Sequence, residues 1–205
     1  MDLEDIGMKK GLLYETVVTT VDGNKKPNAA PIGIICKDKM EVVCYLHHGS
    51  TTVKNIKETK SFVVNVLKDP MIFVESTLGN LPVEKYESHD DKVYVGSTDA
   101  FFVADVTSVK DVERKDQFGV SVTSVVRADV RDITKFKNCV EPLNRAIYGI
   151  VEGLVYLTRM NMVSGDMEKL YRHRMGEIAR IVSKVGGTDH MNAMDRIMKE
   201  FKKFD

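Results

Sequence analysis

Residues 29–36 read AAPIGIIC, a stretch in which neither alternate set of side chains is polar. The two sets are Ala30, Ile32, Ile34 and Cys36, and Ala29, Pro31, Gly33 and Ile35. Successive side chains of a strand point to opposite faces, so a strand of this composition has no face suited to water. Such strands are typical of a closed barrel that is itself covered by a partner subunit or by helices. The stretch therefore predicts a small β-barrel.

Short apolar runs rich in β-branched residues continue on both sides of this stretch, as far as about residue 140. Turn signals separate them, as expected for strands and hairpins. The runs are LLYETVVTTV, EVVCYLHH, SFVVNVL, DAFFVADVTSV and FGVSVTSVV. We interpret residues 110–117, KDVERKDQ, as a solvated hairpin loop because most of their side chains are charged.

Beyond residue 140 the apolar residues recur at intervals of three and four, which indicates amphipathic helices. A first helix is predicted in residues 140–162, with Pro142 in an early helical position. Its single apolar stripe comprises Leu143, Ala146, Ile147, Ile150, Val151, Leu154 and Thr158. A second helix is predicted from Asp166 to Val185, with the two following glycines as its stop, and a third from about Asp189.

The order of strands followed by helices predicts a mainly β protein with α. We place a barrel domain in residues 1–138 and a C-terminal helical subdomain in residues 139–205.

Composition and charge narrow the function classes. The 205 residues include 30 basic and 30 acidic ones, so the formal net charge is zero and we expect neither a nucleic-acid nor a membrane partner. No apolar run approaches the roughly 18 residues that span a bilayer. The N-terminal MDLEDIGMKK does not resemble a signal peptide. Three cysteines without CxxC spacing suit reduced thiols in the cytoplasm better than disulfides or a metal site.

Residues 49–55, GSTTVKN, place a glycine and three hydroxyl groups at the start of a short predicted helix. A helix N-terminus offers unpaired backbone N–H groups and the positive end of a dipole, which together suit a phosphate. Gly49 lets the backbone approach closely, and the further donors and charges are Ser50, Thr51, Thr52, Lys54 and Lys57. The alternative interpretation is one N-cap hydroxyl among ordinary loop residues.

Residues 28–33, NAAPIG, form the second unusual segment. A proline inside a strand lacks a ladder donor and belongs at an edge or a bulge. The small side chains beside it leave room for a flat ligand such as an isoalloxazine ring, which needs an apolar slot with main-chain N–H groups aimed at its ring atoms. The alternative is a bulged barrel strand without a ligand.

Together, NAAPIG and the later GSTTVKNIKETKSFVVNV resemble the FMN-binding split-barrel superfamily, in its flavin reductase-like branch. The tail NRAIYGIVEGLVYLTR resembles the helical extension of an uncharacterised, mainly archaeal group within it. The resemblance implies a Greek-key split β-barrel followed by helices, FMN as cofactor, and a homodimer with the flavin between subunits. It implies that the ring lies along Asn28, Ala29, Ala30 and Pro31. The phosphate end is implied to lie among Ser50, Thr51, Thr52 and Asn55, and we assign Gly49 to the same site.

The implied function is an FMN-binding flavoprotein, an oxidoreductase that uses the flavin for hydride or electron transfer. Alternatives are a non-enzymatic FMN carrier or sensor, and the same barrel binding a deazaflavin or a pyridoxal-type phosphate. Many flavin reductases carry a Gly-Asp-His motif near the later strands. Here the corresponding residues 116–122, DQFGVSV, contain Phe118 and no histidine. We therefore expect slow or absent oxidation of NADH and NADPH and assign no catalytic residue.

Overall fold

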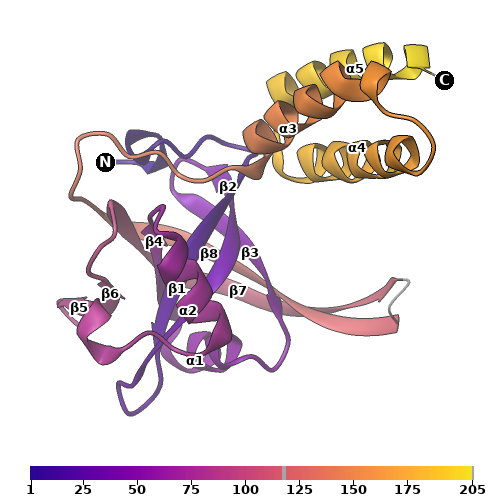
Figure 1. Ribbon diagram of the computed structural model, residues 1–205. Helices are drawn as coiled ribbons and strands as arrows, with labels where there is room; N and C mark the ends of the chain where they lie inside the picture. The colour runs from indigo at the N-terminus through magenta and orange to yellow at the C-terminus, as the bar shows by residue number, and fades with distance from the viewer. Residues whose placement is uncertain (117–118, 205) are drawn as a thin grey trace. The chain divides into compact units, whose positions relative to one another are not determined.

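The computed structural model describes residues 1–116 and 119–204, with no account of the side chains of residues 114–121 (Figure 1). The chain divides into two compact units, Met1–Leu143 and Asn144–Asp205. The boundary that we placed between residues 138 and 139 lies in the linker just ahead of this division.

The first unit is a closed barrel of six antiparallel strands in the order β1-β2-β3-β8-β7-β4. Their bounds are β1 (Leu13–Val21), β2 (Pro27–Asp38), β3 (Glu41–His47), β4 (Ser61–Val66), β7 (Ala100–Asp116) and β8 (Gly119–Lys135). This confirms the predicted mainly β protein with a split barrel and C-terminal helices.

Strands β7 and β8 form a long ribbon that extends beyond the barrel (Figure 1). They pair as far as Asp116 and Gly119, so the hairpin loop predicted at residues 110–117 was wrong for residues 110–116. A two-stranded ribbon outside the barrel meets water on both faces, so charged residues can occupy a strand there. Gln117 lies outside the described residues.

Both faces of β2 carry apolar side chains that are covered. Ile34 and Cys36 point into the barrel and belong to its main buried cluster. On the outer face Ala29 is only 2% exposed and packs in a second cluster with Leu67 and Ile72. Ile72 belongs to α2 (Pro70–Leu78), a helix that the sequence analysis did not predict. Segments of the barrel unit itself therefore cover this part of β2, where we had expected a partner subunit or the C-terminal helices.

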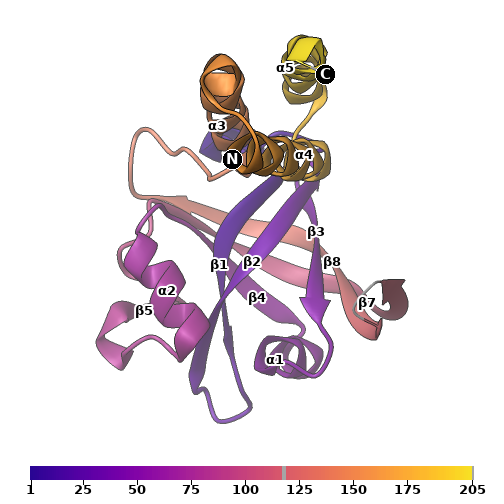
Figure 2. The same cartoon turned by 45° about the vertical axis from the view of Figure 1, so that its right-hand side comes forward.

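The barrel is split where β2 and β3 separate. The pairing of β2 with β1 runs from Ile35 to Pro27, whereas its pairing with β3 covers only residues 34–38. Figure 2 shows the two strands diverging toward α1 (Thr51–Thr59), which lies at that end of the barrel. The remaining elements of the unit are η1 (Leu3–Ile6), η2 (Val83–Lys85), β5 (Tyr86–His89) and β6 (Lys92–Val95).

The second unit contains α3 (Arg145–Arg159), α4 (Asp166–Val185) and α5 (Thr188–Phe201), with short 3-10 turns at Met160–Met162 and Lys202–Phe204. The bounds of α4 and its stop at the glycine pair confirm the prediction. None of the described helices is long and apolar enough to cross a membrane.

Helix α3 begins later than predicted and buries only two residues of its predicted stripe. Asn144 is its N-cap, and the side-chain Oδ1 accepts a hydrogen bond from the backbone N–H of Ala146 at 2.8 Å. Pro142 therefore precedes the helix, because the better cap follows it. Ala146 and Ile150 are buried, whereas Ile147, Val151 and Leu154 of the same stripe are exposed.

Candidate functional site

The N-terminus of α1 holds two backbone donors without a partner. Ser50 is the N-cap, since its Oγ accepts from the backbone N–H of Val53 at 3.3 Å and its carbonyl accepts from that of Lys54 at 3.1 Å. The N–H groups of Thr51 and Thr52 precede the first helical bond, and no described residue accepts from them. Gly49 has φ +79°, a left-handed turn that favours glycine, directly before the cap.

The three hydroxyl groups of this segment have different surroundings. Ser50 is engaged as the cap, as our alternative interpretation required of one hydroxyl. Thr52 is only 3% exposed, and its Oγ1 accepts from Asn28 Nδ2 at 3.2 Å. Thr51 is exposed. Of the three side chains, Thr51 is the one that a ligand can reach freely.

Two amide–hydroxyl pairs tie α1 to the barrel strands. One is the bond from Asn28 on β2 to Thr52. In the other, Asn55 is 4% exposed and its Nδ2 donates to Thr20 Oγ1 on β1 at 3.0 Å. Buried polar groups are normally satisfied in this way. The structure therefore brings Asn28, Thr52 and Asn55 together, as the sequence analysis expected, and uses their polar atoms to fix the helix.

A hollow of about 490 Å³ adjoins this helix start. Its lining residues are Asp22, Lys26, Pro27, Asn28, Thr51, Lys54, Asn55, Glu58 and Asn80. Three of them, Asn28, Thr51 and Asn55, are predicted site residues. Lys54 also lines it, but Lys57 is turned away, with its Nζ 3.1 Å from Asp111 Oδ2.

Charges of both signs line the hollow, and the two acidic residues lie at the β1–β2 turn. Asp22 Oδ1 accepts from the backbone N–H groups of Asn24 and Lys26, both at 2.9 Å, and so holds the β1–β2 turn. Glu58 lies against that turn, since a Cβ on Gly23 would be 2.3 Å from Glu58 Oε1. The two lining lysines, Lys26 and Lys54, form no ion pair within the described chain. Their ammonium groups remain available to an anion.

Asn80 lies on the edge of β2 at the mouth of the hollow. Its Oδ1 accepts from the backbone N–H of Ala29 at 3.1 Å and from Tyr86 Oη at 2.5 Å, and its Nδ2 donates to the carbonyl of Pro27 at 2.8 Å. The carboxamide thus takes the place of a neighbouring strand. The sequence analysis missed both Asn80 and Lys26. Lys26 lies in the turn between β1 and β2, and no local signal marks Asn80.

The predicted ring segment offers carbonyl groups rather than N–H groups. In an antiparallel pair, every second residue directs its backbone N–H and carbonyl toward the partner strand. Backbone groups of residues 26 and 36 bond toward β1, so those of residues 28 and 30 also face β1. The N–H of Ala29 is taken by Asn80, and Pro31 has none. Residues 28–31 therefore offer no main-chain N–H to the open edge, and of the segment 28–33, in which we expected such donors, the N–H of Gly33 remains. Pro31 sits on the edge, where its missing donor breaks no ladder.

A polar cluster anchors the other side of α1. Asp111 Oδ1 accepts from Ser124 Oγ at 2.6 Å, and Asp111 also contacts Lys57 and, at 3.4 Å, His48 Nδ1. The hydrogen bond from Ser124, followed by that from Lys57, lowers the pKa of Asp111 to about 2. His48 precedes Gly49, so the cluster fixes both the loop that begins α1 and the helix itself. Phe118, which marked the missing histidine, lies outside the described residues.

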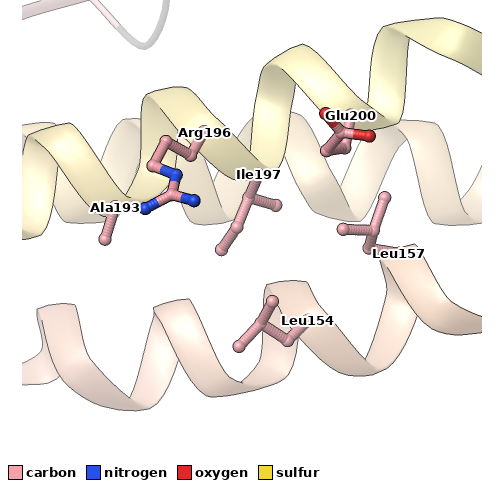
Figure 3. A pocket seen from close by; sticks show the side chains of 6 residues that line it. All are labelled: Leu154, Leu157, Ala193, Arg196, Ile197 and Glu200. Atoms are coloured by element: carbon pink, nitrogen blue, oxygen red, sulfur yellow. The ribbon is translucent and has the colours of Figure 1, made fainter.

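The helical unit has a hollow of a different kind, about 320 Å³ in volume, between α3 and α5. Figure 3 shows Leu154 and Leu157 on one side and Ile197 on the other, with Arg196 and Glu200 beside them. None of the predicted site residues lines it.

Comparisons with known proteins were made on the whole chain. A family model described as the N-terminal domain of a protein of unknown function (DUF447) matches residues 14–128, and the model of the DUF447 C-terminal part matches residues 144–199. The chain belongs to the DUF447 family. This confirms the resemblance to an uncharacterised, archaeal group with a helical extension.

Three relatives place this DUF447 chain further. The uncharacterized protein MJ1453 of Methanocaldococcus jannaschii is 28% identical over 192 residues, which cover 92% of this chain and 97% of that protein. The crystal structure of the FMN-bound DUF447 protein MM1853 from Methanosarcina mazei is 26% identical, covers 97% of this chain and 100% of its own, and has a TM-score of 0.56. The styrene monooxygenase flavin reductase of Pseudomonas putida S12 is 13% identical and covers 64% of this chain and 84% of its own, with a TM-score of 0.49.

Proposed function

We propose that this protein is an FMN-binding flavoprotein in which the N-terminus of α1 holds the phosphate. The observation that carries the proposal is the pair of unpartnered N–H groups at Thr51 and Thr52 beside a hollow that contains Lys26 and Lys54. Backbone donors, a helix dipole and two ammonium groups suit a phosphate dianion. The FMN in a 26% identical protein that matches nearly the whole chain supports the choice of ligand.

The proposal assigns roles to the nine predicted residues. Gly49 and Ser50 shape the start of α1, and Thr51 contacts the phosphate. Thr52 holds α1 against β2 through its hydrogen bond from Asn28, and Asn55 holds α1 against β1 through its hydrogen bond to Thr20. The ring lies along β2 beside Ala29, Ala30 and Pro31, where the carbonyl groups of the bare edge face it.

The proposed activity is that of an oxidoreductase. FMN, when bound, supplies a centre for hydride or electron transfer, and the protein supplies position and electrostatics. We further propose a homodimer with the flavin at the subunit interface, as the resemblance to the split-barrel superfamily implies. Sedimentation of the purified protein tests the second part, and a monomer that still binds flavin contradicts it.

The test of the ligand is the absorbance spectrum of the protein as purified, followed by titration with FMN and with riboflavin. We expect a flavin spectrum and much tighter binding of FMN, since riboflavin lacks the phosphate. A deazaflavin or pyridoxal phosphate spectrum would instead select our alternative cofactors. Equal affinities for FMN and riboflavin would show that the phosphate does not bind at the start of α1.

The electron donor is tested by anaerobic mixing with NADH or NADPH. We expect slow or no bleaching of the flavin, because hydride transfer requires the nicotinamide to be held over the ring in a near-attack geometry. Dithionite should bleach the flavin and oxygen should restore it. Bleaching by a nicotinamide within about a second would contradict this expectation and indicate an ordinary flavin reductase. A flavin that no donor or acceptor turns over would favour the carrier or sensor.

A further inference from the structure

The edge of β2 is bare beyond the position of Asn80. The pairing with β3 begins only at Ile34, so the residues before Gly33 have a strand on one side alone. The backbone N–H of Glu15, which is opposite Gly33, donates to Leu143 at 2.8 Å and so points away from β2. Gly33 therefore directs its own N–H and carbonyl away from β1. The pairing of Ile34 with Cys44 uses the carbonyl of Gly33 as an acceptor toward β3. Within the described part of the chain, the N–H of Gly33 and the carbonyl of Pro31 have no partner.

The carboxamide of Asn80 shows which chemistry fits this edge. It presents an N–H donor and a carbonyl acceptor on adjacent atoms of one plane, and it bonds the carbonyl of Pro27 and the N–H of Ala29. Two residues further along, the equivalent pair would be the carbonyl of Ala29 and the N–H of residue 31, but proline has no N–H. The next equivalent pair is complete. It consists of the carbonyl of Pro31 and the N–H of Gly33.

We propose that the carbonyl of Pro31 and the N–H of Gly33 bind the pyrimidine edge of the flavin, through its N3–H and the adjacent carbonyl. This edge is a planar lactam with the same donor and acceptor on neighbouring atoms as the Asn80 carboxamide. The inference rests on the proposed function, because it names the contact that the ring makes once the phosphate is at α1.

The spacing along β2 agrees with that placement. Asn28 marks the phosphate end, since it bonds Thr52 at the start of α1. The new pair brackets residue 32, four residues away, and at about 3.3 Å per residue the two points are roughly 13 Å apart. A ribityl chain together with the ring has to span such a distance. Both members of the pair are backbone groups, so the contact leaves the side chains on either face of β2 in place.

A strand from a second copy is the competing occupant of this edge. A strand needs a succession of donors and acceptors, and here Asn80 occupies one pair while Pro31 interrupts the next. One complete pair remains before the β3 pairing begins. A short ligand with two binding atoms uses that pair fully, whereas a strand would leave its other backbone groups unsatisfied.

The first experiment compares Gly33→Pro with Gly33→Ala. Gly33 lies in extended strand without a positive φ, and a Cβ there meets only the flexible end of Leu13, at 3.1 Å, so both variants add the same contact. Only proline removes the N–H, which no strand uses. We expect the FMN affinity of Gly33→Pro to be about tenfold below that of Gly33→Ala. Equal affinities of the two variants would overturn the assignment.

A second experiment uses the wild-type protein, which answers the question even if the proline variant fails to fold. N3-methyl FMN lacks the donor for Pro31, so we expect it to bind about tenfold more weakly than FMN. In a ¹⁵N-labelled sample, the Gly33 amide resonance should shift on addition of FMN. An unshifted resonance, or equal binding of both flavins, overturns this inference and leaves the FMN proposal standing.

The two remaining outcomes are also decisive. No binding of FMN by the wild-type protein overturns the proposed function, and this inference with it. A dimer in the absence of flavin that Gly33→Pro converts to a monomer would show a strand on this edge, and that would overturn the lactam contact alone.

Discussion

The start of α1 and the groove between α3 and α5 are both hollow, and they differ in what lines them. The first, about 490 Å³, is lined by amides, hydroxyls and lysines next to unpartnered backbone N–H groups. The second, about 320 Å³, has leucine and isoleucine side chains with one arginine and one glutamate. The comparison teaches that unused backbone donors and unpaired lysines, rather than volume, distinguish the proposed phosphate site from the apolar groove.

Polar side chains at two helix starts of the helical unit bond to groups within that unit. Asn144 caps α3 and also donates from its Nδ2 to the carbonyl of Val185 at 2.9 Å. At the start of α5, the backbone N–H of Gly187 donates to His190 Nδ1 at 3.2 Å. These polar groups serve the packing of their own unit. At α1, by contrast, Thr51 and Thr52 keep free N–H groups at the edge of a hollow.

The largest expected effect tests the anion site directly. Thr51→Glu should weaken FMN binding by a factor on the order of a hundred, because a carboxylate then faces the phosphate dianion at close range. Riboflavin affinity should change less than about twofold. Thr51 is a sharper choice than Thr52, whose side chain is buried and hydrogen-bonded to Asn28. Titration followed by flavin fluorescence measures both ligands.

Thr158→Glu is the matched control, since Thr158 is an exposed threonine on α3. It should leave both affinities unchanged. Equal loss of FMN affinity in the two variants would show that the added charge does not act through a phosphate site at the start of α1.

A second variant disturbs the helical unit alone. Gly153 on α3 is buried, and a Cβ there meets Met175 Sδ at 3.5 Å and Ile178 Cγ2 at 3.7 Å. Gly153→Leu should overpack these helices and lower the free energy of unfolding by about 1–3 kcal/mol. Gly153→Ala makes only ordinary contacts and should gain up to about 1 kcal/mol from helix propensity. Thermal denaturation gives the stability, and FMN affinity should stay constant in both variants.

The anchor at Asp111 gives a smaller, pH-dependent effect on the barrel unit. The folded-state pKa of Asp111, about 2, lies below its ordinary value, so the ionised group stabilises the fold above about pH 4. That contribution is lost as the pH falls toward 2. Asp111→Asn should therefore lower the thermal midpoint at pH 7, and the difference from wild type should shrink between pH 4 and pH 2. A difference in thermal midpoint that stays constant over this range would show that the charge of Asp111 does not stabilise the fold.

The smallest effect is expected in the apolar groove. Leu154→Lys replaces an exposed side chain that lines it, so the free energy of unfolding should change by less than about 0.5 kcal/mol. FMN affinity should be unchanged. A large loss of stability would show that this face is covered in solution, and sedimentation would then identify whether a second copy covers it.

The sequence alone determined the elements whose signals are local. The lack of a polar alternate set in residues 29–36 predicted a strand covered on both faces. Helical periodicity of the apolar residues, with the glycine pair after them, predicted α4 from Asp166 to Val185. An N-cap among the three hydroxyl residues 50–52 and an edge or bulge position for Pro31 follow from the properties of those residues and their immediate neighbours. Each signal depends on residues within a turn of a helix or a few positions along a strand, so it can be read without knowing the fold.

Tertiary structure decided which groups are partnered and which remain free. Ala29 and Asn80 are 51 positions apart in the chain, yet the side chain of Asn80 takes the N–H that we had reserved for the ring. The cover of Ala29 by α2, the turning of Lys57 toward Asp111 and the end of β3 pairing at Ile34 are likewise long-range outcomes. Hydrogen-bond partners depend on strand register and on where distant segments pack, and a local pattern of residue types constrains neither.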